Sequence, residues 1–207
     1  MSKMITLTID GKQVQVKEGA TILEAAKQAG IEIPTLCHYE GLEPYGACRI
    51  CSVEIEKKGR TRIVAACCYP VEEGLKVKTR TPKIDKIRKT ILELAAITAG
   101  EDVAGKFNAL ASEYNADLSR FRSKVDVEPT KCILCGLCIR RCVEANYDSA
   151  IGFVGRAIYR EIVLFPEKEY LCMTCSYCRD TCPTGRITAS GPIGVFPHAD
   201  DVLAGRR

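Results

Sequence analysis

Two runs of four cysteines carry the chemistry that this sequence can support. The spacing C-x2-C-x2-C-x3-C occurs first at Cys132, Cys135, Cys138 and Cys142, and returns at Cys172, Cys175, Cys178 and Cys182. Three thiolates spaced two residues apart can wrap a small metal–sulfur cube in a tight loop, while the fourth lies on the following segment. The doubled spacing therefore predicts two [4Fe–4S] clusters.

The same spacing predicts how the ligands divide between the clusters. In two-cluster ferredoxins the fourth cysteine of each run binds the other cluster. We therefore expect Cys132, Cys135, Cys138 and Cys182 to hold the first cluster, and Cys172, Cys175, Cys178 and Cys142 to hold the second. A structural zinc site needs two cysteine pairs, and disulfides need an oxidising compartment. Neither alternative fits two identical runs of four.

A third group of cysteines lies nearer the N-terminus. Cys37, Cys48 and Cys51 are followed by the adjacent pair Cys67 and Cys68. Plant-type domains place three cysteines in one loop and a fourth later in the chain, so this group predicts one [2Fe–2S] cluster. The spacing leaves the fourth ligand open between Cys67 and Cys68. We expect the remaining cysteine to be a small buried hydrophobe.

A histidine ligand is the alternative for this cluster, because two histidines can replace two cysteines. His38 follows Cys37 directly, and His198 is the only other histidine in the chain. Since four cysteines are already available, we expect His38 to be a loop residue near the cluster.

The N-terminal segment has the pattern of a small mixed domain. Apolar residues alternate over residues 4–10 and again at Val14 and Val16, and the Asp10-Gly11 pair between them predicts a hairpin turn. Thr21 and Glu24 form a capping box that opens a helix. A second hairpin is expected around Lys58-Gly59. This order predicts a β-grasp fold, and its cysteines argue against a cofactor-free, ubiquitin-like version.

The rest of the chain is predicted to be helical and then cysteine-rich. Residues 82–125 lack cysteine and histidine. Ile84, Ile87, Ile91, Leu94 and Ala95 follow helical spacing, and basic residues including Arg88 fall on the opposite, solvated face. We expect an α+β protein with a [2Fe–2S] domain at 1–81, a helical connector at 82–125, a 2[4Fe–4S] ferredoxin domain at 126–190 and an extended tail at 191–207 that becomes ordered on a partner.

Charge and hydropathy narrow the possible partners. The formal charge is +4, but each oxidised cluster with its thiolates carries about 2−, so three clusters bring the total to about −2. This removes the basic bias expected of a nucleic-acid-binding protein. The N-terminus has no apolar leader, and no apolar run approaches the roughly 18 residues of a membrane span. We expect a cytoplasmic protein, attached to a membrane complex through partners if at all.

Longer stretches around the cysteines carry a family resemblance. They are residues 34–40 (PTLCHYE), 46–51 (GACRIC), 131–138 (KCILCGLC) and 150–156 (AIGFVGR). Over about residues 3–190 the sequence resembles the N-terminal iron–sulfur region of the large G-type (75 kDa) subunit of complex I. It is equally similar to the diaphorase iron–sulfur subunit of NAD-reducing hydrogenases and to the N-terminal part of [FeFe] hydrogenases. Residues 66–71 look like the A-C-x-x-P-V element of related domains, which favours Cys67 as the fourth [2Fe–2S] ligand.

One departure from that family is expected to matter. The family usually holds a further [4Fe–4S] cluster on one histidine and three cysteines, after the helix that ends here near residues 94–99. This chain has the residues TAGED at positions 98–102 and no ligand there. The resemblance therefore predicts three clusters, with the histidine-ligated cluster absent.

The expected function is electron transfer. The chain shows no G-x-G-x-x-G fingerprint and no acid–base constellation, so we expect a non-catalytic subunit of a hetero-oligomeric oxidoreductase complex. The resemblance implies a flavin- and NAD-binding subunit at one end. At the other end it implies a catalytic subunit: a hydrogenase, a formate dehydrogenase or another reductase, including an electron-bifurcating one.

Two other functions remain open. The first is the iron–sulfur subunit of a succinate dehydrogenase or fumarate reductase, but the ten-residue gap after Cys37 argues against it. The second is a cluster-based redox sensor, which would need an output module.

Overall fold

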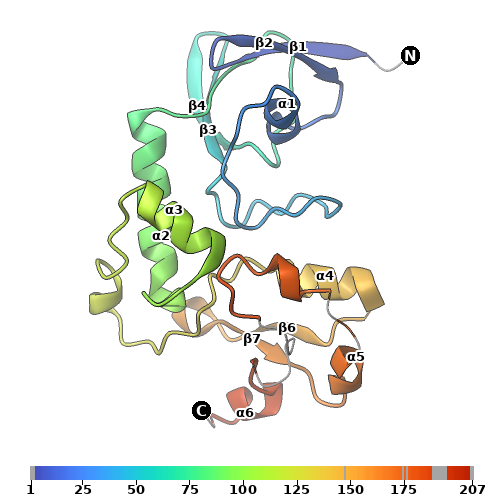
Figure 1. Cartoon of the computed structure of the whole chain (residues 1–207), viewed down its shortest axis with the longest axis vertical. Helices are drawn as coiled ribbons and strands as arrows, with labels where there is room; N and C mark the ends of the chain where they lie inside the picture. The colour runs from blue at the N-terminus through green and yellow to red at the C-terminus, as the bar shows by residue number, and fades with distance from the viewer. Residues whose placement is uncertain (1–2, 147, 174, 176, 188–194, 206–207) are drawn as a thin grey trace. The chain divides into compact units, whose positions relative to one another are not determined.

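The chain forms two compact units in the computed structural model shown in Figure 1. The structure describes residues 3–146, 148–173, 175, 177–187 and 195–205. The first unit contains residues 1–38 and 43–91, and the second contains residues 39–42 and 92–207. The boundary falls inside helix α2 (Pro82–Ala99), so the helix that we expected in a separate connector is shared between the units.

The first unit is built on a five-stranded sheet. Its strands, in the order β2-β1-β5-β3-β4, are Lys12–Lys17, Met4–Ile9, Lys76–Lys78, Ser52–Lys57 and Arg60–Ala65. β1 pairs in parallel with β5, and the other neighbours are antiparallel. The short crossover strand β5 thus joins two hairpins into one sheet.

Both predicted hairpin turns are confirmed. Asp10 and Gly11 have φ angles of 48° and 82°, and Lys58 and Gly59 have 50° and 73°. Two successive residues with positive φ match the right-handed twist of the paired strands. Pairing of Leu7 with Val14 then places the alternating apolar residues of both strands on one face.

The predicted capping box opens helix α1 (Ile22–Gln28). The Thr21 hydroxyl oxygen accepts from the Glu24 amide at 3.2 Å, and the Glu24 carboxylate accepts from the Thr21 amide at 2.7 Å. Beyond the last turn, Gly30 takes a φ of 71°, which ends the helix as expected.

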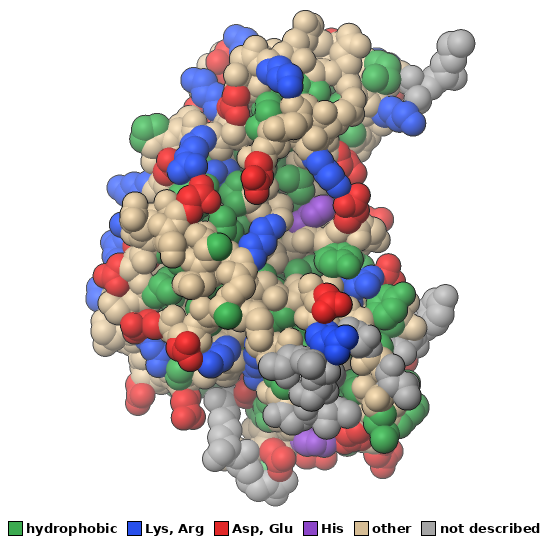
Figure 2. All heavy atoms as spheres, viewed as in Figure 1, with side chains coloured by type: hydrophobic (Ala, Val, Ile, Leu, Met, Phe, Trp, Pro, Cys, Tyr) green, Lys and Arg blue, Asp and Glu red, His purple; other side chains and the backbone are tan. Residues whose placement is uncertain are grey.

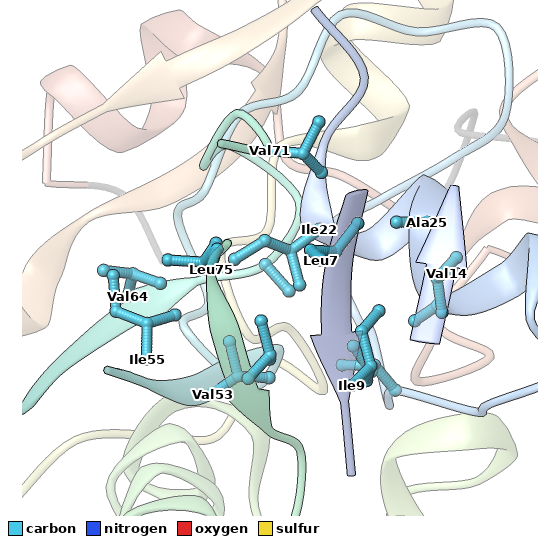
Figure 3. Close-up of a cluster of buried hydrophobic side chains, with 14 of the residues drawn as sticks. Leu7, Ile9, Val14, Ile22, Ala25, Val53, Ile55, Val64, Val71 and Leu75 are labelled. Carbon is cyan, nitrogen blue, oxygen red and sulfur yellow. The ribbon is translucent and has the colours of Figure 1, made fainter. Parts of the chain in front are cut away.

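The core of the first unit lies between the sheet and α1. Leu7, Ile9, Val14, Val53 and Ile55 project from the sheet, and Ile22 from α1 meets them (Figure 3). Cys51 and Cys67 belong to the same buried cluster. The domain core therefore reaches the sulfur atoms of two predicted ligands and shields them from water.

The described part of the second unit consists of short helices and one strand pair, joined by loops. After α2 come α3 (Gly105–Glu113), η1 (Arg122–Lys124), α4 (Leu137–Asn146), β6 (Ile151–Val154), η2 (Ala157–Tyr159), β7 (Glu161–Leu164), α5 (Glu169–Met173), η3 (Arg179–Thr181) and α6 (Ala199–Leu203). β6 and β7 form an antiparallel pair. No helix in the described part of the chain is both long and apolar enough to cross a membrane.

The helices of the expected connector bind the cysteine-bearing loops directly. The Phe107 amide donates to the carbonyl oxygen of Pro183 at 2.9 Å, one residue after Cys182. The Thr98 hydroxyl donates to the carbonyl oxygen of Cys132 at 2.8 Å. Residues of the expected connector thus hold the backbone of two cysteine-bearing loops in place within the second unit.

The buried face of α2 differs from the one we predicted. Ile84, Arg88, Leu92 and Ala96 are all at most 2% exposed, whereas Leu94 is 48% exposed. The spacing of four places these residues along one side of the helix. Arg88 was expected on the solvated face, and that expectation was wrong.

The C-terminal segment is not a wholly extended arm. In residues 195–205 Phe196 is buried in the core of the second unit, and the Leu164 amide donates to the carbonyl oxygen of Pro197 at 2.9 Å. Helix α6 follows. Burial of the Phe196 ring holds this segment against β7. The local pattern of glycines and prolines does not predict this contact. Gly191, Pro192 and Gly194, on which the expectation partly rested, lie outside the described residues.

The surface carries charges of both signs. On the face shown in Figure 2, basic and acidic side chains are interspersed over the described part of both units. The expected basic side of α2 is reduced by the burial of Arg88.

Candidate functional site

The N-terminal cysteines form two close pairs. Cys37 Sγ accepts a hydrogen bond from the Cys48 amide at 3.4 Å, and the sulfurs of Cys51 and Cys67 lie 3.4 Å apart. Two thiolates on one tetrahedral metal, with bonds of about 2.3 Å, would lie roughly 3.8 Å apart. The Cys51–Cys67 pair therefore fits a single iron, and Cys37 with Cys48 would serve the other iron of a [2Fe–2S] cluster.

Protonation of these thiols reflects their close approach. The hydrogen bond between Cys51 and Cys67 lowers the pKa of Cys51 to about 7 and raises the pKa of Cys67. The hydrogen bond with Cys37, together with burial, raises the pKa of Cys48. The thiols of Cys48 and Cys67 therefore resist losing their protons. Metal binding replaces those protons with positive charge.

Cys68 departs from expectation. We expected a buried small residue, but Cys68 is exposed. Its chain neighbour Cys67 is 2% exposed, so the two adjacent cysteines differ in burial. Cys68 Sγ lies 3.5 Å from Cys67 Sγ. A Cβ on Gly46 would fall 2.8 Å from Cys68 Sγ, so the glycine in the cysteine loop leaves room for this sulfur.

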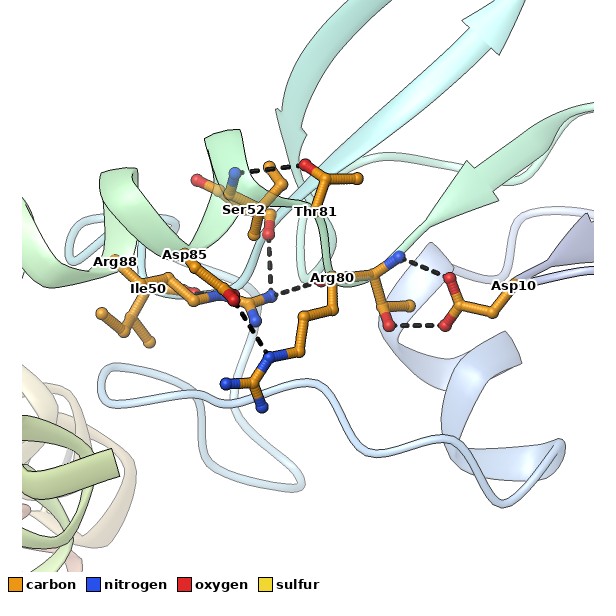
Figure 4. Close-up of polar contacts among 9 residues, drawn as sticks. Asp10, Ile50, Ser52, Arg80, Thr81, Asp85 and Arg88 are labelled. Atoms are coloured by element: carbon orange, nitrogen blue, oxygen red, sulfur yellow. Dashed lines mark hydrogen bonds and ion pairs between the residues drawn. The ribbon is translucent and has the colours of Figure 1, made fainter. Parts of the chain in front are cut away.

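Arg88 forms hydrogen bonds with the backbone on both sides of Cys51 (Figure 4). Its guanidinium donates to the carbonyl oxygens of Ile50 at 3.1 Å, Ser52 at 2.9 Å and Thr79 at 3.0 Å. Ile50 and Ser52 flank Cys51, so one buried side chain fixes the backbone on both sides of a predicted ligand. Sequence reasoning missed this residue. The signal was available in the spacing of Ile84, Arg88 and Leu92, which places Arg88 between two buried apolar residues.

The first cavity of the second unit gathers cysteines from both runs. Its lining includes Cys132, Cys135 and Cys138 from the first run and Cys182 from the second, and it encloses about 310 Å³. This is the crossed grouping that the spacing predicts. Apolar side chains surround the four sulfurs; these residues are Ile133, Leu137, Ile162, Pro183, Ile187 and Phe196.

The loop around this cavity points backbone N–H groups at sulfur. Leu134 and Gly136 have φ angles of 55° and 71°, which turn the chain tightly between the cysteines. The Leu134 amide then donates to Cys132 Sγ at 3.3 Å. The Thr184 hydroxyl lies 3.4 Å from Cys182 Sγ and donates to the carbonyl oxygen of Lys131 at 2.7 Å, which links the two runs. The bond from the Leu134 amide stabilises negative charge on the Cys132 sulfur.

The second cavity has the complementary grouping. Cys142 from the first run lines it together with Cys172, Cys175 and Cys178, and it encloses about 280 Å³. The Ala150 amide donates to Cys142 Sγ at 3.3 Å. Ile151, Leu171 and Tyr177 complete the described lining.

The two cavities differ in exposure. In the first cavity only Cys182 of the four cysteines is half-buried, whereas in the second both Cys172 and Cys175 are half-buried. Tyr170 and Met173, on either side of Cys172, are 65% and 76% exposed. Arg141 stacks 4.4 Å from the Tyr177 ring and 4.7 Å from the Tyr39 ring, and it forms an ion pair with Glu144. The second cavity is thus closer to solvent than the first.

Burial favours the protonated form of several thiols in the two cavities when no metal is bound. It raises the pKa of Cys138 well above its usual range, and it raises those of Cys172 and Cys178 to about 11. Burial also raises the pKa of Cys132, against the opposing charge of Arg186. A cavity lined by apolar groups and four thiols is suited to thiolate ligation of iron, because metal binding removes the protons and neutralises the thiolates.

Glycines beside the cavities make room for protein groups. A Cβ on Gly152 would fall 2.5 Å from the Phe165 ring, and one on Gly155 would collide with the carbonyl oxygen of Tyr159. Their close neighbours are thus an aromatic ring and backbone.

A site for a single metal ion needs several ligands around one point, which is a different arrangement from that of a cluster. Within the described ranges, no three His, Cys, Asp or Glu side chains converge on a point where one metal ion would bind. In an iron–sulfur cluster each thiolate binds its own iron, or shares one with a single partner, so the ligands surround the cluster.

Comparisons with known proteins support a [2Fe–2S] cluster in the N-terminal part of the chain. Residues 2–82 match the family model described as 2Fe-2S iron-sulfur cluster binding domain. The chain is 36% identical over 203 residues to NADPH-Fe(3+) oxidoreductase subunit alpha of Geobacter sulfurreducens, covering 89% of this chain and 24% of the relative. It is 35% identical over 205 residues to the NADH-ubiquinone oxidoreductase 75 kDa subunit of Reclinomonas americana, covering 90% and 29%. The chain is homologous to the G/75 kDa subunit of NADH-quinone oxidoreductases.

Hydrogenases provide further relatives of this G/75 kDa homologue. It is 32% identical over 214 residues to NADP-reducing hydrogenase subunit HndD of Solidesulfovibrio fructosivorans, covering 89% of this chain and 36% of HndD. A chain in the crystal structure of an NAD+-reducing [NiFe]-hydrogenase in the H2-reduced state superposes with a TM-score of 0.73 at 28% identity, covering 87% and 85% of the two chains. The G/75 kDa homologue spans about a quarter of the length of the first curated relatives.

Proposed function

We propose that this G/75 kDa homologue relays single electrons through three iron–sulfur clusters. The [2Fe–2S] cluster is held by Cys37, Cys48, Cys51 and Cys67. The first [4Fe–4S] cluster is held by Cys132, Cys135, Cys138 and Cys182, and the second by Cys172, Cys175, Cys178 and Cys142. The observation that carries the proposal is the crossed grouping of four cysteines around each of two cavities.

The roles of the chain's own residues follow from the geometry. Bound clusters would supply one-electron redox chemistry. The protein holds the thiolates, donates backbone N–H groups from Leu134 and Ala150 to sulfur, and excludes water with apolar side chains. In each case it stabilises a buried negative charge that water would otherwise solvate.

The relatives support an assembly with NAD(P)H-linked subunits. Their names describe NADPH-Fe(3+) and NADH-ubiquinone oxidoreductases and an NADP-reducing hydrogenase. We propose that the chain works in a hetero-oligomeric, cytoplasmic or peripherally membrane-attached complex. A flavin- and NAD-binding subunit would lie at one end of the relay. A hydrogenase, formate dehydrogenase or other reductase, including an electron-bifurcating one, would lie at the other.

The second cavity is the more favourable place for electrons to leave or enter. Its half-buried cysteines lie beside the exposed side chains of Tyr170, Met173 and Tyr177. Aromatic residues and methionine are enriched at protein interfaces.

The test is the cluster content of the anaerobically purified chain in its native complex. We expect about ten iron and about ten acid-labile sulfide atoms per chain, from one [2Fe–2S] and two [4Fe–4S] clusters. Reduction should give one [2Fe–2S] signal and two magnetically coupled [4Fe–4S] signals in electron paramagnetic resonance. Zinc without sulfide would overturn the proposal. A fourth cluster bound to this chain would overturn the predicted absence of the histidine-ligated cluster.

A further inference from the structure

One cationic side chain lines the first cavity. Arg186 lies four residues after Cys182 and shares the cavity wall with Cys132, Cys182 and Phe196. Its Nη2 donates to the carbonyl oxygen of Val195 at 3.2 Å, and its guanidinium carbon lies 4.7 Å from the centre of the Phe196 ring. These two contacts hold the guanidinium at a defined place in the wall.

The other terminal nitrogen of Arg186, Nη1, is buried and has no acceptor with hydrogen-bond geometry in the described part of the chain. The guanidinium lies close enough to the Cys132 thiol to interact with it, and no carboxylate among the described residues pairs with this arginine. It costs free energy to bury an N–H group without an acceptor, and more so when the group is charged. An anionic acceptor in the cavity would remove that cost.

The four thiols are the only other titratable groups among the described residues that line this cavity. A [4Fe–4S] cluster with four thiolates carries a net charge of about 2− when oxidised and about 3− when reduced. A nearby cation therefore stabilises the reduced form more than the oxidised form.

We propose that Arg186 donates an N–H hydrogen bond from Nη1 to a sulfur of the first [4Fe–4S] cluster and raises the reduction potential of that cluster. This inference rests on the proposed function. It concerns one cluster of the pair, because none of the described residues that line the second cavity is cationic. The nearest counterpart, Arg141, stacks on Tyr177 and is paired with Glu144, so its charge is partly neutralised.

The test compares Arg186→Gln and Arg186→Lys with the control Arg160→Gln. Arg160 is an exposed arginine of the same unit that stacks on Phe153, so its loss removes one positive charge away from the cavity. Each full-length variant is purified in its complex, and the two [4Fe–4S] reduction steps are followed by electron paramagnetic resonance during a redox titration.

Arg186→Gln should lower the equilibrium constant for one of the two steps at least tenfold, which is a shift of about 59 mV for a one-electron couple. Arg186→Lys should show a smaller shift of the same step, because it keeps the charge without the planar fork. Arg160→Gln should move neither step. Unchanged steps in Arg186→Gln, or a shift no larger than that of Arg160→Gln, would overturn the proposal.

If Arg186→Gln does not retain its clusters, the variant Arg186→His provides a second test of the same charge. In Arg186→His the side chain is charged at about pH 5.5 and neutral at about pH 8.5. The affected step should therefore be more positive at the lower pH than at the higher, by more than any change in the wild-type chain. A pH dependence equal to that of the wild type would refute the role of the charge. Absence of [4Fe–4S] signals from the wild type would instead refute the proposed function.

Discussion

The Nη2 atom of Arg88 donates a hydrogen bond of 2.9 Å to the carbonyl oxygen of Ser52, the residue that follows Cys51. The same side chain reaches the carbonyl oxygen of Ile50, the residue before Cys51. A helix residue distant in sequence thus sets the path of the backbone at a predicted ligand.

Arg88→Met should therefore weaken the first unit and its cluster together. The substitution leaves three buried carbonyl oxygens without this donor, and we expect about 3 kcal/mol lower stability. The [2Fe–2S] signal should be reduced or shifted while the [4Fe–4S] signals persist. Denaturant unfolding and electron paramagnetic resonance measure the two effects. Lys86→Met, an exposed position on the same helix, is the control and should change stability by less than about 0.5 kcal/mol.

The adjacent cysteines Cys67 and Cys68 should behave differently. Cys67 is buried beside Cys51, whereas Cys68 is exposed. Cys67→Ser should alter or abolish the [2Fe–2S] signal, and Cys68→Ser should leave it at wild-type intensity. The reverse pattern in the reduced spectra would show that Cys68 is the ligand.

The crossed grouping predicts an unusual effect of Cys182→Ser. Although Cys182 belongs to the second run, it lines the first cavity. Its loss should remove the first [4Fe–4S] cluster, about four of ten iron atoms, and disturb the second cluster less strongly. Iron analysis combined with electron paramagnetic resonance separates these outcomes. Cys178→Ser is the matched control, and it should remove the second cluster instead.

Glu93 is a buried carboxylate that stabilises the second unit. Its side chain is 0% exposed, and it accepts hydrogen bonds from Arg120 Nη1 at 2.7 Å and from the Asp117 amide at 3.3 Å. Glu93→Ala should lower stability by about 2–4 kcal/mol, because the Arg120 guanidinium and the Asp117 amide lose their buried acceptor. Thermal unfolding of the holoprotein measures the change. Glu101→Ala, at an exposed position, should have no comparable effect.

Removal of the clusters should affect the two units unequally. The first unit has a mainly apolar core between its sheet and α1, which also contains Cys51 and Cys67, whereas the smaller core of the second includes Cys132, Cys138, Cys142 and Cys178. Chelation of iron should therefore expose the amides of β6 and β7 to hydrogen exchange well before those of β1 and β2. Equal protection loss in both strand pairs would contradict this prediction.

The features that sequence alone determined are local ones. The Asp10-Gly11 turn and the Thr21–Glu24 capping box depend on residues at most a few positions apart, so their chemistry could be recognised directly. The spacing of the cysteine runs is equally local, and it also predicted which thiols would share a cavity. A short spacing restricts the loop so strongly that few arrangements of its sulfurs remain.

Tertiary structure decided the features that depend on distant partners. Arg88 can be buried because the carbonyl oxygens of Ile50, Ser52 and Thr79 all lie within hydrogen-bonding distance of its guanidinium. Phe196 required a hydrophobic core into which the C-terminal segment could fold back. A charged or aromatic side chain is stabilised in the interior only where such partners converge, and their convergence is a property of the folded chain rather than of neighbouring residues.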